Sequence, residues 1–231
     1  MMELDNAVAP NVRARRLSFQ PTITPGFIVG VATAIGVAAV LSQAGIYLIG
    51  HFVVGTNLVH QETAETFKTV SGAVSVGFAA RAALALIAVS VATGASRLLF
   101  ALVLFFAADE AVDIHEIVGN GVSAVVGVSP DAAWPAIYAP LLIVAAILIL
   151  RVLHDGPQVA RTAGRTGLAC LGLSLVVGLV WVVVRGRGYH GSDRHIVELV
   201  TEEGLELLGW CLIAGALAAV AWTRRSRRAP P

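Results

Sequence analysis

The sequence of 231 residues contains little charge: Asp, Glu, Lys and Arg make up only 13% of it, whereas hydrophobic residues make up 57%. A soluble domain carries about a quarter charged residues, so the composition excludes an ordinary soluble fold. No basic patch indicates nucleic acid as a partner. The only two cysteines, Cys170 and Cys211, both lie in apolar stretches, and a disulfide framework is therefore not supported.

Long apolar stretches take the place of charge. Each is close to the roughly 20 residues that a helix needs to cross a bilayer. The sequence therefore predicts an all-α polytopic membrane protein, a bundle of about six transmembrane helices. The expected spans are 26–50, 70–92, 97–118, 134–153, 166–184 and 196–222. Residues 1–25 form a polar N-terminal tail, residues 26–223 the transmembrane domain and residues 224–231 a basic tail.

Basic residues set the expected orientation. Eleven arginines fall in segments on the side of the N terminus, against four basic residues on the other side. The positive-inside rule then favours both termini in the cytoplasm, with the chain in the inner (cytoplasmic) membrane. The first span also resembles a signal peptide, with a small-x-small triplet at Ser42-Gln43-Ala44. The apolar sequence continues beyond it, which favours an uncleaved helix.

Acidic residues interrupt the third span in the stretch FFAADEAVDIHE, residues 105–116. At about 100° per residue, Asp109, Asp113 and Glu116 share one stripe of a continuous helix. Glu110 lies beside that stripe, whereas His115 points elsewhere. The third span is expected to carry these residues toward the outer face.

The sixth span carries a matching stripe of His195, Glu198, Glu202 and Glu206, with Glu203 beside it. The two stripes have similar depth, so they are expected to face each other. Carboxylates at such depth cost about 2.5–3.5 kcal/mol each. They need protons, a cation or a counter-ion, for which Arg81 in the second span is the candidate. A structural interpretation, with carboxyls hydrogen-bonded to neighbouring helices, stays open.

DEAVD at 109–113 and EEGLE at 202–206 share the pattern acid-acid-x-x-acid, in the third span of each half. Such symmetry is typical of inverted repeats in transporters. It is also how two antiparallel helices build a di-metal site. Tyr138 and the tryptophans near span ends indicate an aromatic belt at the membrane interface, and we assign them no chemistry.

DEAVDIHE, followed some 85 residues later by EEGLELLG, resembles a group of bacterial multi-pass membrane proteins with a DEA-x-x-IHE helix and a late EE-x-LE-x-LG helix. Glu62 in HQETAETF is similar to a glutamate in their first outer loop and is a possible contributor to the site. The resemblance implies the architecture and the site, but no activity.

Three functions are compatible with these residues. The first is a metal-dependent enzyme acting on a lipid or other apolar substrate, with a divalent ion such as iron, manganese or zinc. Neither E-x-x-H nor H-E-x-x-H is present, which weakens it. The second is a cation- or proton-coupled transporter, and the third an accessory subunit of a membrane complex. The expected metal ligands are Asp109, Glu110, Asp113, His115, Glu116, His195, Glu202, Glu203 and Glu206.

Overall fold

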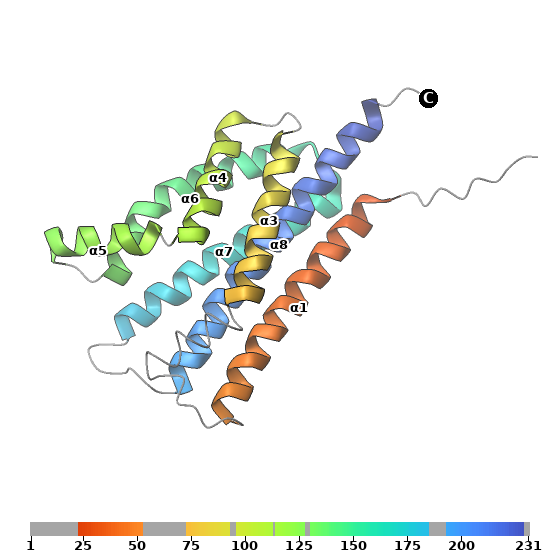
Figure 1. Ribbon diagram of the computed structural model, residues 1–231. Helices are drawn as coiled ribbons and strands as arrows, with labels where there is room; N and C mark the ends of the chain where they lie inside the picture. Colours follow the sequence, from red (N-terminus) through yellow and green to blue (C-terminus); the bar gives the residue numbers. More distant parts are fainter. Residues whose placement is uncertain are drawn as a thin grey trace, which may run out of the picture.

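The computed structural model describes residues 23–52, 73–92, 96–112, 114–127, 130–184 and 193–228. These residues form seven helices and no strand (Figure 1). The all-α prediction is therefore confirmed for the described part of the chain. The helices are α1 (Pro25–Phe52), α3 (Ala73–Ala92), α4 (Arg97–Val112), α5 (Ile114–Val126), α6 (Pro130–His154), α7 (Gln158–Val184) and α8 (Asp193–Arg228).

Four of these helices are long and apolar enough to cross a membrane. The apolar segments are Pro25–Gly45, Ala136–His154, Gln158–Val180 and Val200–Arg227. The outer helices also leave large apolar side chains exposed, which would be costly in water; examples are Phe27, Leu41, Ile143 and Val176. The composition and this apolar surface define a membrane-embedded protein whose helices contact lipid.

The expected third span is wrong as a single helix over 97–118. The chain is helical in α4 up to Val112, and a new helix, α5, begins at Ile114. The two helices run in clearly different directions in Figure 1. With 16 residues, α4 is about 24 Å long at 1.5 Å per residue. It is therefore shorter than the roughly 30 Å of hydrocarbon in a bilayer.

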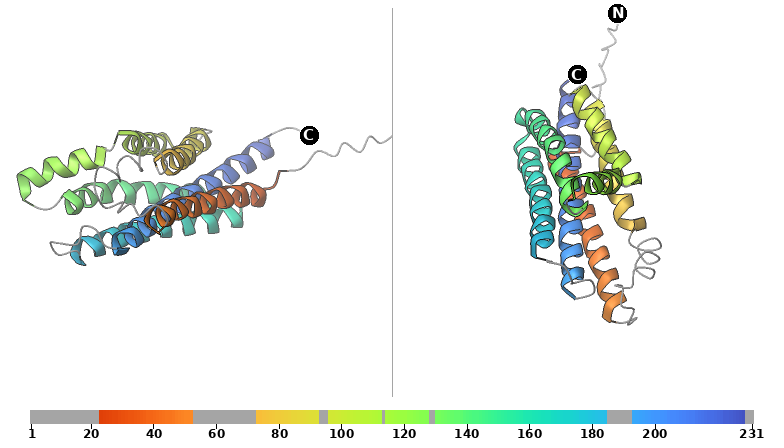
Figure 2. Two further views of the ribbon diagram at one scale, coloured as in Figure 1. Left: turned by 60° about the horizontal axis from the view of Figure 1, so that its bottom comes forward. Right: turned by 90° about the vertical axis from the view of Figure 1, so that its left-hand side faces the viewer.

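Helix α8 is the centre of the bundle. It packs against α1, α3, α6 and α7, and it runs between α1 and α7 in Figures 1 and 2. Its apolar residues are buried nearly all round, including Leu207, Ile213 and Leu217. A helix that is apolar on every side belongs in an interior, and this explains why the longest helix is also the most covered.

Glycines bring α7 and α8 close together. A Cβ added at Gly167 would lie 2.8 Å from the carbonyl oxygen of Gly209, and one added at Gly209 would lie 2.9 Å from that of Gly167. Small residues at such crossings let two backbones approach directly in lipid. This contact fixes the face of α8 that carries the acids relative to α7.

Candidate functional site

Asp109 binds the beginning of α5. Its Oδ1 accepts a hydrogen bond of 2.7 Å from the backbone N–H of His115, and its side chain is buried. The first N–H groups of a helix have no partner within the helix, and a negative charge there is favourable. A carboxylate in the last turn of α4 thus stabilises the start of the next helix.

Two side chains complete this arrangement. Nδ1 of His115 lies 3.1 Å from Asp109 Oδ2, and the hydroxyl of Tyr138, on α6, donates to Asp109 Oδ1 at 3.0 Å. The rings of His115 and Tyr138 meet edge to face, with centroids 6.3 Å apart. We call Asp109, His115 and Tyr138 the Asp109 cluster. Three donors therefore converge on one buried carboxylate.

The expectation that His115 points away from Asp109 is wrong. It assumed a continuous helix, in which residues 109 and 115 differ by about 600°, or 240° after full turns. The break after Val112 turns the chain back and brings both the N–H and the ring of His115 to Asp109. Tyr138 was assigned to the aromatic belt. In the structure Tyr138 instead donates a hydrogen bond to Asp109, because a buried carboxylate needs hydrogen-bond donors.

The acids of α8 form a second polar region. Glu202, Glu203 and Glu206, which we call the α8 acid cluster, lie within about 100° of the helix circumference and are partly buried. The Gln43 amide on α1 donates through Nε2 to Oε2 of Glu203. A Cβ added at Gly178, on α7, would lie 3.0 Å from Cδ of Glu202, so glycine makes room for that carboxylate.

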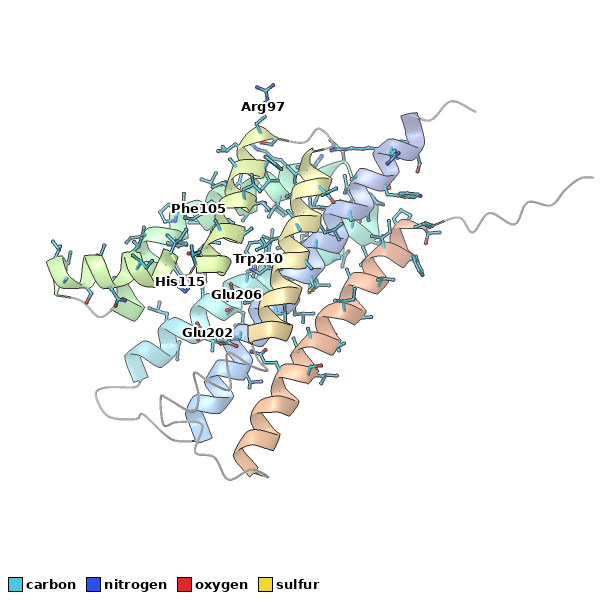
Figure 3. The ribbon with its side chains drawn as sticks, in the orientation of Figure 1. Arg97, Phe105, His115, Glu202, Glu206 and Trp210 are labelled. Atoms are coloured by element: carbon cyan, nitrogen blue, oxygen red, sulfur yellow. The ribbon has the colours of Figure 1, made fainter. Side chains whose placement is uncertain are left out.

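The residue that follows this cluster one turn later is Trp210. Its ring packs against Phe106 of α4, with centroids 5.8 Å apart. Phe106 in turn meets Phe105 at 5.7 Å, and Phe105 meets Tyr138 at 5.7 Å. In Figure 3, Glu202, Glu206 and Trp210 follow one another along α8. A row of ring contacts thus runs from Trp210, next to the α8 acid cluster, to Tyr138 of the Asp109 cluster.

Asp109 is the one acid of the first predicted stripe whose side chain is described, and its bonds do not go to the acids of α8. The facing of the two stripes stays a prediction. Within the described residues no Cα atom of α4 lies within 8 Å of one in α8, and the hydrogen bonds of Asp109 go to α5 and α6. In the same part of the chain, no three His, Cys, Asp or Glu residues could hold a metal ion together. Asp109 and His115 are close to each other, and so are the α8 acids.

Several predicted site residues lie outside the described structure. Asp113 and Glu62 are not among the described residues, and the side chains of Arg81, Glu110, Glu116 and His195 are not described. The backbone of Arg81 belongs to α3, which packs against α8. Their roles as ligands, counter-ion or outer-loop contributor stay predictions.

Fold and polar interior together define a helical membrane protein with titratable groups held between its helices. The chain belongs to a family described as a domain of unknown function (DUF8692), whose model matches residues 26–221. The match covers all seven helices at least in part. No curated protein and no solved structure matches the chain.

Proposed function

We propose that this is a six-span protein of the inner membrane, with both termini in the cytoplasm, that binds a divalent metal ion near the outer face. It acts there on a lipid or another apolar substrate. The excess of arginine on the side of the termini supports the orientation. The third crossing then consists of α4 and the break that follows it.

In this orientation the Asp109 cluster lies in the outer half of the bilayer. Asp109 is twelve residues after Arg97, the first residue of α4, which corresponds to about 18 Å along the helix. The hydrocarbon core is about 30 Å thick. Helix α5 then continues at a shallower angle than a crossing helix, close to the outer interface.

The pairing of Asp109 with His115 carries the proposal of a metal site. Metal-binding histidines almost always donate the other ring N–H to a carboxylate, a backbone carbonyl or a water, which fixes the tautomer and the ring orientation. Asp109 stands in this position at Nδ1. Its oxygens already accept from three donors, so Asp109 fits as the residue that orients His115 and does not fit as a ligand.

The other ligands would come from the acids of the same stretch, Glu110, Asp113 and Glu116. Carboxylates with one imidazole suit iron, manganese or zinc. When bound, such an ion would polarise substrate or water. Within the chain, Asp109 positions His115, and Tyr138 holds Asp109 in place from α6.

Metal content tests the proposal. The purified protein, loaded with iron, manganese or zinc in turn, should retain one of them near stoichiometrically. His115→Ala should lose it, and Asp109→Asn should bind about 10–100-fold more weakly because the orienting carboxylate is gone. His154→Ala, in the exposed pair with Asp155, is the matched control and should keep the metal. A wild type that retains none of the three ions contradicts the proposal.

Labelling from outside intact cells tests the orientation. Val125, on α5, is 86% exposed, so Val125→Cys should react with an impermeant thiol reagent before lysis. Arg151→Cys, at the other end of α6, should react only after lysis. The reverse pattern would place the Asp109 cluster on the cytoplasmic side.

A cation- or proton-coupled transporter is the second candidate. The observation that favours it is the position of the α8 acid cluster on the central helix of the bundle, between α1 and α7. Acids placed deep between helices mark ion and proton pathways in membrane proteins.

A further inference from the structure

Two buried polar atoms beside the α8 acid cluster have no hydrogen-bond partner among the residues that the structure describes. They are Oε1 of Gln43 and Nε1 of Trp210, in residues that are only 1% and 4% exposed. Buried polar groups are nearly always paired, because an unpaired one keeps the whole cost of its desolvation. The amide oxygen of Gln43 accepts a hydrogen bond and the indole N–H of Trp210 donates one, so the first needs a donor and the second an acceptor.

Both atoms belong to the surroundings of the acids. The amide that carries Oε1 of Gln43 donates through Nε2 to Glu203, so Oε1 lies next to that carboxylate. Trp210 follows Glu206 by one helical turn. Side chains on a helix lean toward its N terminus, so the indole leans toward Glu206, its neighbour along α8 in Figure 3.

The residues of this region differ in solvent exposure. Glu202, Glu203 and Glu206 are partly exposed, whereas Gln43 and Trp210 are buried. Gly178 leaves space on α7 for the carboxylate of Glu202. The amide oxygen of Gln43 and the indole N–H of Trp210 are therefore in more deeply buried residues than the acids beside them.

The hydrogen-bonding groups define the chemistry of the ligand. Three carboxylates and an amide oxygen suit a cation with several N–H donors, and the faces of Trp210 and Phe106 favour a positive charge. A bare metal ion offers no acceptor to the indole N–H. The ligand must combine a cationic donor with an acceptor oxygen.

We propose that the α8 acid cluster, with Gln43 and Trp210, binds a primary ammonium group that carries an oxygen acceptor on the same molecule. The ammonium group bonds to the acids and to Oε1 of Gln43, and the acceptor oxygen receives the indole N–H of Trp210. This site shares no residue with the Asp109 cluster. The shared chemistry occurs in an aminophospholipid head group and in a free amino phosphate.

Titrations of the full-length protein in detergent distinguish these sources. The probes are short-chain phosphatidylethanolamine, the matched phosphatidylcholine and free phosphoethanolamine. Saturable binding of the ethanolamine lipid with weaker binding of the free compound assigns the site to the head group, whereas equal binding assigns it to a soluble amine. Both results support the ammonium site. Equal affinity for the choline lipid overturns it, because a quaternary ammonium has no N–H to donate.

Variants connect the binding to these residues. Glu206→Gln and Gln43→Leu should each weaken binding about tenfold, the equivalent of one charge-assisted hydrogen bond. Gly178→Ala should also weaken it, because the new methyl group displaces the carboxylate of Glu202. Gly172→Ala is the control on the same helix, since a Cβ there would meet nothing within 4 Å. Unchanged affinity in the first three variants overturns the proposal.

The indole proton gives a readout independent of affinity. Its resonance, assigned by its absence from Trp210→Phe, should move downfield when the ethanolamine lipid is added, because the N–H gains an acceptor. The other indole protons should not move in the same way. A Trp210 resonance that stays in place while the lipid binds overturns the assignment.

Discussion

The described part of the chain contains two aspartate–histidine pairs of almost equal length in opposite surroundings. Asp109 and His115 are joined at 3.1 Å, and Asp155 and His154 at 3.0 Å. The side chains of the first pair are 12% and 29% exposed, and those of the second 77% and 83%. In the first pair water is largely replaced by a backbone N–H and a tyrosine hydroxyl.

This difference shows that distance alone does not reveal what a pair contributes. An exposed ion pair gains little, because water and salt screen it and two side chains must be ordered. A buried network is stronger, and its loss leaves groups without partners. The Asp109 pair also holds a helix break in place, whereas Asp155 and His154 are sequence neighbours at the end of α6.

Asp109→Ala is expected to give the largest difference in unfolding free energy between the buried pair and the exposed pair. The change removes the acceptor of one backbone N–H and two side-chain groups, all at least partly buried. We expect the free energy of unfolding to fall by about 3 kcal/mol, measured by reversible unfolding in mixed detergent. Asp155→Ala is the matched control and should leave it unchanged. Equal effects at both positions would contradict the comparison.

A double-mutant cycle isolates the pairwise energy from these total effects. For Asp109→Ala and His115→Ala, the coupling should be about 2 kcal/mol, since the two groups are in contact within one network. The same cycle on Asp155 and His154 should give additive effects. A coupling near zero for the buried pair would mean that the backbone contact of Asp109 accounts for its contribution.

Much of this architecture can be predicted from composition and periodicity, but the helix break cannot. The residues around 113 continue a helical pattern with no proline or glycine between Phe105 and Glu116. The α5 start depends on the Asp109 carboxylate and on Tyr138 from another helix. Local pattern does not contain such tertiary contacts, so a continuous span was expected.

The neighbours of the acidic residues could not be predicted for a related reason. Counting residues along a helix gives depth in the membrane, but it does not give the neighbour on each side. Phe106 and Trp210 occupy the space between α4 and α8. Gln43 belongs to a cleavage-like triplet in the sequence, but a polar residue inside an apolar span is itself a signal of a polar partner, here Glu203.

Tyr138→Phe tests how much of the buried network depends on its third member. The variant keeps the ring contacts with Phe105 and His115 and removes only the hydroxyl that donates to Asp109. One net hydrogen bond corresponds to about 1 kcal/mol, so the unfolding free energy should fall by that amount. Helicity measured by circular dichroism should not change. A loss as large as that of Asp109→Ala would show that Tyr138 is the main support of the break.

The smallest effect is expected at the exposed pair, in the titration of Asp155. A hydrogen bond with His154, and then the charge of His154, lower the pKa of Asp155 below its usual 3.8, and Arg224 adds a smaller attraction. Because the folded pKa is lowered, any stabilisation is present above the unfolded pKa and is lost as the pH falls through the folded value. In His154→Gln the Asp155 pKa should therefore rise toward the ordinary value, which a carboxyl ¹³C NMR titration measures. Arg224→Gln should raise it less. If the Asp155 pKa is the same in His154→Gln as in the wild type, the short contact of the exposed pair has no electrostatic consequence in solution, and the contrast with the buried pair becomes sharper still.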